Sequence, residues 1–263
     1  MAELPLRWVV VCEAVGDCDL ATGLADRYAL EPAHGLGDWI RDDLDTYRHW
    51  RGLTDQDRFM PWKWVAAVAK QRRLRVHGYK GPETLPSFEV LRVFRLIALS
   101  EEKLPAGLLL VRDTDADRTR RQEFTESVRE LQALLDGRGA GMRLCLALPH
   151  PEAEAWLLAG FEPESAEEQE ALEVVRRDLG YDPRLHADRM NPGVEVTAQG
   201  PVRSSTKRVL DALTAGDSDR RRRCWADAPF ERLRARGGDA GLTDFFKDLD
   251  AQFLASLREA GGP

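Results

Sequence analysis

The sequence predicts an α/β fold built on a mostly parallel sheet sandwiched by helices. Two segments, Trp8–Cys12 and Gly107–Val111, are short and continuously apolar, and a third, Met142–Leu148, is apolar except for Arg143. Such runs are typical of strands that are buried on both faces. Helical patterns separate these segments, and strands that alternate with helices are joined by right-handed crossovers into a parallel sheet. We therefore expect a Rossmann-like core with helices on both of its faces.

Composition narrows the class of protein. The chain has 263 residues, of which 43% are hydrophobic and 32% are charged, and its formal net charge is −7. The negative charge argues against a protein that coats nucleic acid through a generally basic surface. No apolar run approaches the ~18 residues of a membrane span. The four cysteines have no metal-finger spacing, so we expect free thiols, a cytoplasmic location and no membrane partner.

The first expected strand, Trp8–Cys12, is followed directly by Glu13. Open α/β sheets place their binding sites at the carboxyl ends of their strands, so Glu13 is a candidate functional residue. Asp17 and Asp19 come slightly later, where a helix begins. We interpret both as helix caps, because Asp is a favoured N-cap residue.

The segment 31–72 has a weaker pattern and is expected to form a helical insertion or lid. Within it, the apolar spacing suggests one helix over 38–50 and a short helix near 62–68. A short strand is expected to follow and to end at His77, which could contact a phosphate group. A structural role is the alternative for this histidine. A further helix is expected over 87–100.

Three carboxylates follow the most apolar expected strand at alternate positions: Asp113, Asp115 and Asp117. In an extended segment alternate side chains share a face, which would bring Asp113 and Asp115 together. Carboxylates held that close repel each other unless a cation lies between them. Oxygen ligands of this kind suit Mg²⁺ or Mn²⁺. The alternative is a solvated acidic turn that caps the helix expected from about residue 120.

The expected strand Met142–Leu148 also delivers acidic residues at its carboxyl end. It runs into a turn, His150-Pro-Glu152-Ala-Glu154, and then into a helix. Glu152 is explained by compensation of the helix dipole in the first turn. Glu154 lies beside Ala155 and close to core positions, an unusual place for an unpaired charge, and is the stronger candidate ligand.

The remainder, 161–263, is expected to be a helical extension packed on a core of residues 1–160. Ser165 and Glu168 form a capping-box pattern at the start of one helix. Lys207 lies near the start of another, where the helix dipole disfavours a cation unless an anion is close. The alternative for Lys207 is a solvated surface lysine.

The chain has one dense basic run, Arg220–Arg223. Within it, Arg221 and Arg222 are candidate contacts to a nucleic-acid backbone. Pairing with neighbouring carboxylates is an equal alternative for the whole run. The flanking acidic residues are Asp217, Asp219 and Asp227.

Taken together, Glu13 after a Val-Val-Val-Cys strand, His77-Gly78 after a strand-like segment, and Asp113-Thr-Asp115 after Leu-Leu-Leu-Val resemble a TOPRIM domain. Topoisomerases, bacterial primases, recombination-mediator proteins and OLD-type nucleases share this domain. The resemblance covers roughly residues 6–160. The segment that ends in Glu154-Ala-Trp is also similar to small TOPRIM-like proteins, some of which look like parts of anti-phage defence systems with an ATPase partner.

The resemblance implies roles for several residues. Glu13 would be a metal-linked general acid/base, and Asp113 and Asp115 would bind Mg²⁺. Asp117 and Glu154 are the positions that could complete a second metal site, as in the nuclease branch. OLD-type nucleases use a lysine beside the metals, which makes Lys207 the candidate to stabilise transition-state charge. The chain departs from the family pattern at Ala14, where the usual residue is glycine.

The leading hypothesis is therefore a Mg²⁺- or Mn²⁺-dependent nuclease with two metal ions, with DNA favoured over RNA as the substrate. No tyrosine has the setting of a topoisomerase nucleophile, and no zinc-binding primase module is recognisable. The rival hypothesis is a catalytically silent TOPRIM-like scaffold that binds nucleic acid or a protein partner. An Asp-x-Asp phosphatase or phosphotransferase explains less, because it leaves Glu13 and Glu154 without a role. An ATPase partner and a homo-oligomer are both compatible with the sequence.

Overall fold

The computed structural model describes residues 5–36, 40, 42–74, 86–192, 196–197, 200–201 and 204–260. These residues form two compact units. Unit 1 comprises the described parts of Met1–Arg112, Arg118–Leu146 and Lys247–Pro263, and unit 2 comprises Asp113–Asp117 and the described parts of Ala147–Phe246. The segment Asp113–Asp117, called the acidic turn below, thus packs with the second half of the chain. The sequence-based division into residues 1–160 and 161–263 stays a prediction.

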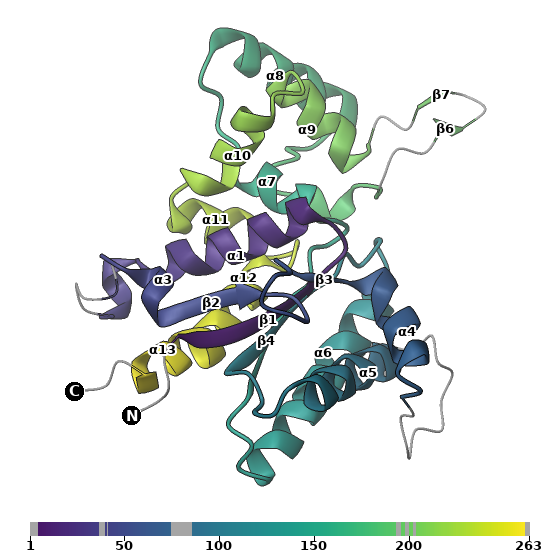
Figure 1. Ribbon diagram of the computed structural model, residues 1–263. Coiled ribbons are helices and arrows are strands. Elements are labelled where there is room, and N and C mark those ends of the chain that lie inside the picture. Colours follow the sequence, from purple (N-terminus) through teal and green to yellow (C-terminus); the bar gives the residue numbers. More distant parts are fainter. Residues whose placement is uncertain are drawn as a thin grey trace. The chain divides into compact units, whose positions relative to one another are not determined.

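Unit 1 contains a five-stranded sheet (Figure 1). Its strands are β1 (Leu6–Cys12), β2 (Arg48–Arg51), β3 (Met60–Pro61), β4 (Gly107–Val111) and β5 (Arg143–Ala147). The order is β2-β1-β4-β5, and β3 also pairs with β1. β1 runs parallel to β2, to β3 and to β4. The predicted α/β class with a mostly parallel sheet is confirmed.

The register of the sheet explains one glycine. Gly107 is paired with Trp8 on the neighbouring strand. A Cβ atom at Gly107 would lie 2.5 Å from carbons of the Trp8 ring, a distance that a real side chain cannot adopt. Glycine at this position therefore lets the buried indole lie flat against β4.

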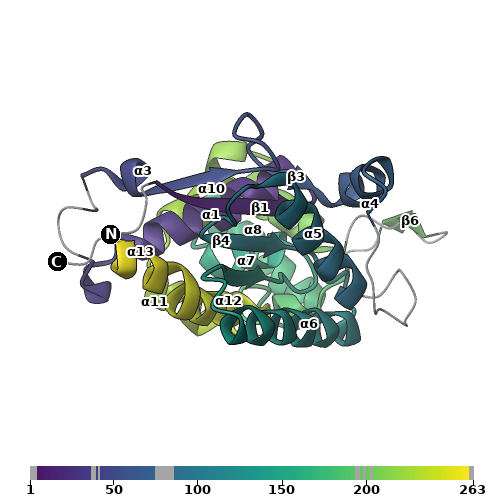
Figure 2. The ribbon, with the colours of Figure 1, turned by 60° about the horizontal axis from the view of Figure 1, so that its bottom comes forward.

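Helices flank the sheet of unit 1, as Figures 1 and 2 show. In chain order they are α1 (Val15–Ala29), the 3₁₀ turn η1 (Pro32–His34), α3 (Leu44–Tyr47), α4 (Trp62–Gln71), α5 (Pro86–Ser100), α6 (Arg118–Gly137), the π-helical turn η3 (Leu249–Phe253) and α13 (Leu254–Ala260). α5 lies beside α4 and α6. α1 contacts β1, β4 and η3. The buried stripes of these helices complete the apolar core around the sheet.

The helix expected over 38–50 is wrong beyond Tyr47, because Arg48–Arg51 is strand β2. The sequence of β2 is mostly polar, so it lacks the apolar signature of a buried strand. Tertiary contacts stabilise it instead. Arg48 and Trp50 both donate hydrogen bonds to Asp26 of α1, and the Trp50 ring packs against Trp8 and Phe253. Burial raises the pKa of Asp26 more than these donors lower it.

Unit 2 is mainly helical (Figure 1). Its elements are α7 (Glu154–Gly160), α8 (Ala166–Leu179), the 3₁₀ turn η2 (Ala187–Arg189), the short strands β6 (Val196–Thr197) and β7 (Gly200–Pro201), α9 (Thr206–Thr214), α10 (Ser218–Ala226), α11 (Phe230–Arg236) and α12 (Leu242–Asp248), which crosses into unit 1 at Lys247. β6 and β7 pair antiparallel.

The short helix α7 is the centre of unit 2, because α9, α10, α11 and η2 all pack against it. Its end must come very close to α10. A Cβ atom at Gly160 would lie 1.7 Å from the Cys224 carbonyl oxygen, so only glycine fits there. Trp156 of α7 stacks on Phe245, and its indole N–H donates to the Ala240 carbonyl. This packing fixes the segment that carries Glu152 and Glu154.

Two further expectations are confirmed. The Ser165 side chain accepts a hydrogen bond from the Glu168 backbone N–H, so Ser165 is the N-cap of α8. All four cysteines are buried and free of disulfides. In the part of the chain that the structure describes, no helix combines the length and the apolar character that a membrane span requires.

Candidate functional site

The acidic residues after β4 lie in a tight turn, not in an extended segment. Asp115 and Ala116 both have left-handed backbone conformations, with φ of 51° and 62°. This conformation is uncommon for residues other than glycine and is costly for alanine. The alternation argument for Asp113 and Asp115 is therefore wrong, because the extended geometry ends before Asp115. Asp117 immediately precedes α6.

Backbone hydrogen bonds hold this turn against the loop after β5. The Thr114 N–H donates to the Pro149 carbonyl at 3.2 Å, and the Asp115 N–H donates to the Pro151 carbonyl at 3.0 Å. Within the turn, the Asp117 N–H donates to the Thr114 carbonyl at 2.8 Å. Two acidic segments that are distant in sequence are thus joined inside unit 2.

A buried side-chain pair strengthens this connection. Thr114 Oγ1 lies 2.7 Å from His150 Nδ1, and the two residues are 1% and 2% exposed. The same hydroxyl lies 3.1 Å from the Pro149 carbonyl oxygen. The His150 backbone N–H donates to the Ala240 carbonyl, which also accepts from Trp156. The acidic turn is therefore anchored, through His150, to the core around α7.

Glu152, which the sequence explained by compensation of the helix dipole, is 3% exposed. Its carboxylate accepts a hydrogen bond from the Thr206 hydroxyl at the start of α9. Its second oxygen, Oε2, lies 3.0 Å from Lys207 Nζ. A buried carboxylate requires partners of this kind. Glu152 therefore connects the loop before α7 to the N-terminus of α9.

The charges of three carboxylates act on Lys207. Burial alone would lower the pKa of this lysine, but the hydrogen bond with Glu152 and the charges of Glu154, Glu152 and Asp113 together raise it. The ammonium group is thus held protonated at neutral pH. Near a helix N-terminus a cation needs a nearby anion, and Glu152 supplies it, as the sequence led us to expect. The structure brings Asp113, Glu154 and Lys207 into one electrostatic neighbourhood.

Glu13 belongs to unit 1 and lies at the carboxyl ends of β1 and β4. Its Oε1 atom is 3.0 Å from Arg112 Nε. The Arg112 guanidinium lies over the Trp62 ring, whose N–H donates to the Val111 carbonyl. Arg112 is thereby fixed beside Glu13, which gives the carboxylate a cationic neighbour at the end of the strand.

The backbone next to Glu13 is shaped by a helix cap. Ala14 is the N-cap of α1, and the Asp17 carboxylate, at the third helical position, accepts a hydrogen bond from the Ala14 N–H at 3.0 Å. Asp17 therefore caps the helix from within its first turn and is not the N-cap residue. Asp19 lies inside the helix and is ion-paired with Arg58. Ala14 has φ of −140°, a conformation that any residue adopts.

The basic run Arg220–Arg223 lies in α10, and its arginines engage carboxylates. Arg220 is buried and binds Glu168 at 2.7 Å. Arg221 pairs with Asp211, and Arg223 pairs with Glu164 at 3.0 Å. The partners expected from sequence were the flanking aspartates, and Asp217 instead caps α10. A nucleic-acid-binding role for Arg221 and for the exposed Arg222 stays a prediction.

The remaining predicted residues are not tested. His77 lies outside the described residues. Within the described ranges, no group of three or more His, Cys, Asp and Glu side chains is arranged to hold a metal ion. The metal roles of Glu13, Asp113, Asp115, Asp117 and Glu154 stay predictions.

Sequence reasoning missed three residues of the neighbourhood that the structure assembles, namely Thr114, His150 and Thr206. It explained Glu152 by compensation of the helix dipole. The signal for the ion pair of Glu152 was indirect: a lysine at a helix start implied a nearby anion, but the sequence did not say which one.

No family model, curated protein or solved structure matches this chain.

Proposed function

We propose that this protein is a Mg²⁺- or Mn²⁺-dependent nuclease that hydrolyses phosphodiester bonds, with DNA favoured as the substrate. One observation carries the proposal: the half-exposed Lys207 ammonium lies 3.0 Å from the Glu152 carboxylate and within range of the charges of Glu154 and Asp113. A cation set among acidic groups, next to a strained acidic turn, is typical of a site that handles phosphate through both protein cations and metal ions. The TOPRIM resemblance agrees with this assignment.

The residues present fit the proposed metal in their chemistry. Asp113, Asp115, Asp117 and Glu154 offer only hard oxygen donors, which Mg²⁺ and Mn²⁺ prefer. Mg²⁺ in nucleotide-processing enzymes is commonly held by one or two carboxylates, with water and substrate phosphates completing its shell. Of these four carboxylates, Asp113 and Glu154 are the ones whose charges act on Lys207, and we assign them as the principal metal ligands. When bound, the metal would polarise the phosphodiester and activate water for in-line attack.

The chain's own residues supply the rest of the chemistry. An ammonium group has three donors, and the contact with Glu152 uses one of them. Lys207 is 43% exposed, so a phosphate oxygen can reach it. Lys207 would bind that oxygen and stabilise the charge that develops on it. Glu152 and Thr206 would position Lys207. The proposed general acid/base role of Glu13 rests on the resemblance alone.

Nicking of supercoiled plasmid tests the proposal. The purified chain should nick DNA with Mg²⁺ or Mn²⁺ and lose this activity in EDTA. Asp113→Asn should reduce the rate on the order of 100-fold or more. Asp178→Asn is a matched control, because Asp178 is exposed on α8. Full activity of the Asp113 variant would show that the nicking has another source. The Glu13→Gln variant separately tests the proposed acid/base role of Glu13.

The scaffold alternative also has a specific observation in its favour. Arg112 is ion-paired with Glu13, the residue that the resemblance makes the acid/base group. A silent scaffold would bind DNA in a mobility-shift assay without nicking it, and its binding would persist in EDTA and in the Asp113→Asn variant. An ATPase partner, a homo-oligomeric form and a role in anti-phage defence remain part of the proposal, and co-purification with neighbouring gene products tests them.

A further inference from the structure

A second site is suggested by a cavity at the amino-terminal ends of the strands in unit 1. Its volume is about 730 Å³, within the range of small-molecule pockets. It is lined by the start of β1, by the segment that enters β4, by the segment that enters β5, and by α13. The Arg143 N–H donates to the Ala106 carbonyl, so β4 and β5 begin side by side here.

The cavity is separate from Glu13 and Arg112 of the same unit. It lies at the amino ends of the strands, whereas Glu13 and Arg112 lie at their carboxyl ends. The seven residues of β1 span roughly 20 Å in extended form. A ligand in the cavity would therefore bind independently of Glu13.

Three cations from three different segments line the cavity: Arg7, Lys103 and Arg143. Glu259 is the acidic residue in the lining, and it is paired with Arg143. Arg7 lies 3.5 Å from Glu101, but that carboxylate is bound more closely, at 2.6 Å, by the buried Arg51. The lining thus carries more positive than negative charge, in a chain whose net charge is −7.

Apart from Ser256, the rest of the lining is apolar. Leu6, Leu104, Pro105 and Ala140 contribute to the wall, and Leu6 and Pro105 are buried. A cavity with an apolar wall and several cations suits a ligand with an anionic group on a less polar body. Arginine recognises phosphate through paired N–H donors, and lysine adds a compact positive charge.

We propose that this cavity binds a small phosphomonoester, of about the size of a mononucleotide, through Arg7, Lys103 and Arg143. The proposal does not depend on nuclease activity. Lys103 is exposed, so it is the residue whose substitution least affects folding.

Isothermal titration calorimetry of the full chain tests the site, with AMP, ribose 5-phosphate and adenosine as probes. EDTA is present, so that no metal can recruit phosphate to the acidic residues. AMP should bind with a stoichiometry of one, and adenosine, which lacks the phosphate, should not bind. Binding of ribose 5-phosphate would show that the phosphate dominates recognition, and its failure would show that the base contributes through the apolar wall.

Two variants locate the bound probe. Lys103→Gln and Arg143→Gln should each weaken AMP binding about tenfold or more. Lys70→Gln, at an exposed lysine of α4 outside the cavity, should leave the affinity unchanged. Thermal unfolding of Lys103→Gln should match that of the unmodified chain, which separates a lost contact from a damaged fold.

Several results would overturn the proposal. These are the absence of AMP binding at millimolar concentration, equal binding of adenosine, or unchanged affinity in both cavity variants. Loss of AMP binding in Lys207→Met, with full binding in Lys103→Gln, would place the nucleotide at the candidate nuclease site instead.

Discussion

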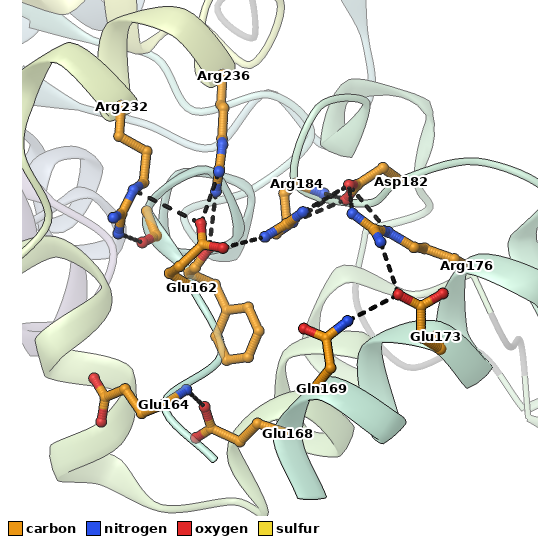
Figure 3. Close-up of polar contacts among 12 residues, drawn as sticks. Glu162, Glu164, Glu168, Gln169, Glu173, Arg176, Asp182, Arg184, Arg232 and Arg236 are labelled. Atoms are coloured by element: carbon orange, nitrogen blue, oxygen red, sulfur yellow. Dashed lines mark hydrogen bonds and ion pairs between the residues drawn. The ribbon is translucent and has the colours of Figure 1, made fainter. Parts of the chain in front are cut away.

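Unit 2 contains two clusters of charged side chains that differ in how their cations and carboxylates are arranged. In the first, shown in Figure 3, the guanidinium groups of Arg184, Arg232 and Arg236 surround Glu162. Asp182 in turn accepts from Arg176 and Arg184. In the second cluster, the charges of Glu152, Glu154 and Asp113 act on the ammonium group of Lys207. We call the first the arginine network and the second the lysine cluster.

The difference suggests what each cluster does. The arginine network connects the loop after α7, the end of α8 and α11, and each of its carboxylates has guanidinium partners at hydrogen-bonding distance. Such a network stabilises a fold. In the lysine cluster, carboxylate charges act on a half-exposed ammonium group that a phosphate oxygen can also reach. Substitutions in the network should therefore affect stability, and substitutions in the cluster should affect activity.

The largest effect is expected for Lys207→Met. Removing a donor that stabilises developing charge should lower the nicking rate about 10²- to 10³-fold. The buried Glu152 would also lose its ammonium partner, which should lower the free energy of unfolding by about 1–3 kcal/mol. The nicking rate and urea-induced unfolding measure the two effects.

A double variant separates the two effects of that change. Adding Glu152→Gln to Lys207→Met removes the uncompensated buried charge, so the free energy of unfolding should recover while the nicking rate stays low. Recovery of both quantities would mean that Lys207 matters only as a structural partner of Glu152, and the lysine cluster would then resemble the arginine network.

Asp182→Asn is expected to have the next largest effect, and on stability alone. The side chain of Asp182 is 14% exposed and accepts hydrogen bonds from two guanidinium groups and from the Arg184 backbone N–H. Asparagine keeps the shape but removes the charge, so we expect a loss of about 2–3 kcal/mol in the free energy of unfolding. The exposed Asp178→Asn should change it by less than about 0.5 kcal/mol.

The nicking rate tests the comparison in the same variant. Measured well below the unfolding temperature, the rate of Asp182→Asn should equal that of the unmodified chain. A reduced rate in the folded variant would show that the arginine network contributes to the proposed site, and the contrast between the two clusters would fail.

The pH dependence of stability sharpens the role of the network. Burial would raise the pKa of Asp182, but hydrogen bonds from Arg184 and Arg176 outweigh it and lower the pKa to about 2. For Glu162, burial also opposes the hydrogen bonds and charges of Arg236 and Arg184, and its pKa is lowered as well. A carboxylate with a lowered folded-state pKa stabilises the protein above its unfolded-state value. This contribution is lost as the pH falls through the folded-state value.

We therefore expect Asp182 to contribute about 2 kcal/mol at neutral pH and to lose this contribution between about pH 4 and pH 2. The unfolding free energies of the unmodified chain and of Asp182→Asn should converge over that window. Guanidinium denaturation at a series of pH values measures both. A constant difference down to pH 2 would mean that the charge of Asp182 is not what stabilises the network.

Local sequence signals predicted the elements that depend on local patterns. The apolar runs of β1, β4 and β5 identified these strands, and Ser165 with Glu168 identified the start of α8. Strand β2 could not be predicted, because Asp26, Trp8 and Phe253, which stabilise its polar residues, are distant in the sequence. Periodicity carries no information about such partners.

The candidate site shows the same difference between features set by local sequence and features set by long-range contacts. The sequence located acidic residues at the ends of apolar strands, since that depends only on chain position. It could not show that Glu152 is buried, because its burial depends on Thr206, which lies 54 positions further along the chain. Nor could it show the left-handed turn at Asp115 and Ala116, which is held by hydrogen bonds to the loop after β5. Long-range pairing decides both features.

The smallest effect is expected for Thr114→Val, which tests whether the lysine cluster depends on its anchoring. Valine fills the same volume but cannot hydrogen-bond to His150 Nδ1, so the free energy of unfolding should fall by about 1 kcal/mol. Loss of a hydrogen bond that orients metal ligands typically lowers activity about tenfold or more. We therefore expect the nicking rate of Thr114→Val to fall about tenfold. Thr114→Ser keeps the hydroxyl and should restore most of that rate. Because Thr114 is buried beneath the acidic turn, a normal rate in the valine variant would mean that the turn's backbone hydrogen bonds to Pro149 and Pro151 position the acidic residues unaided.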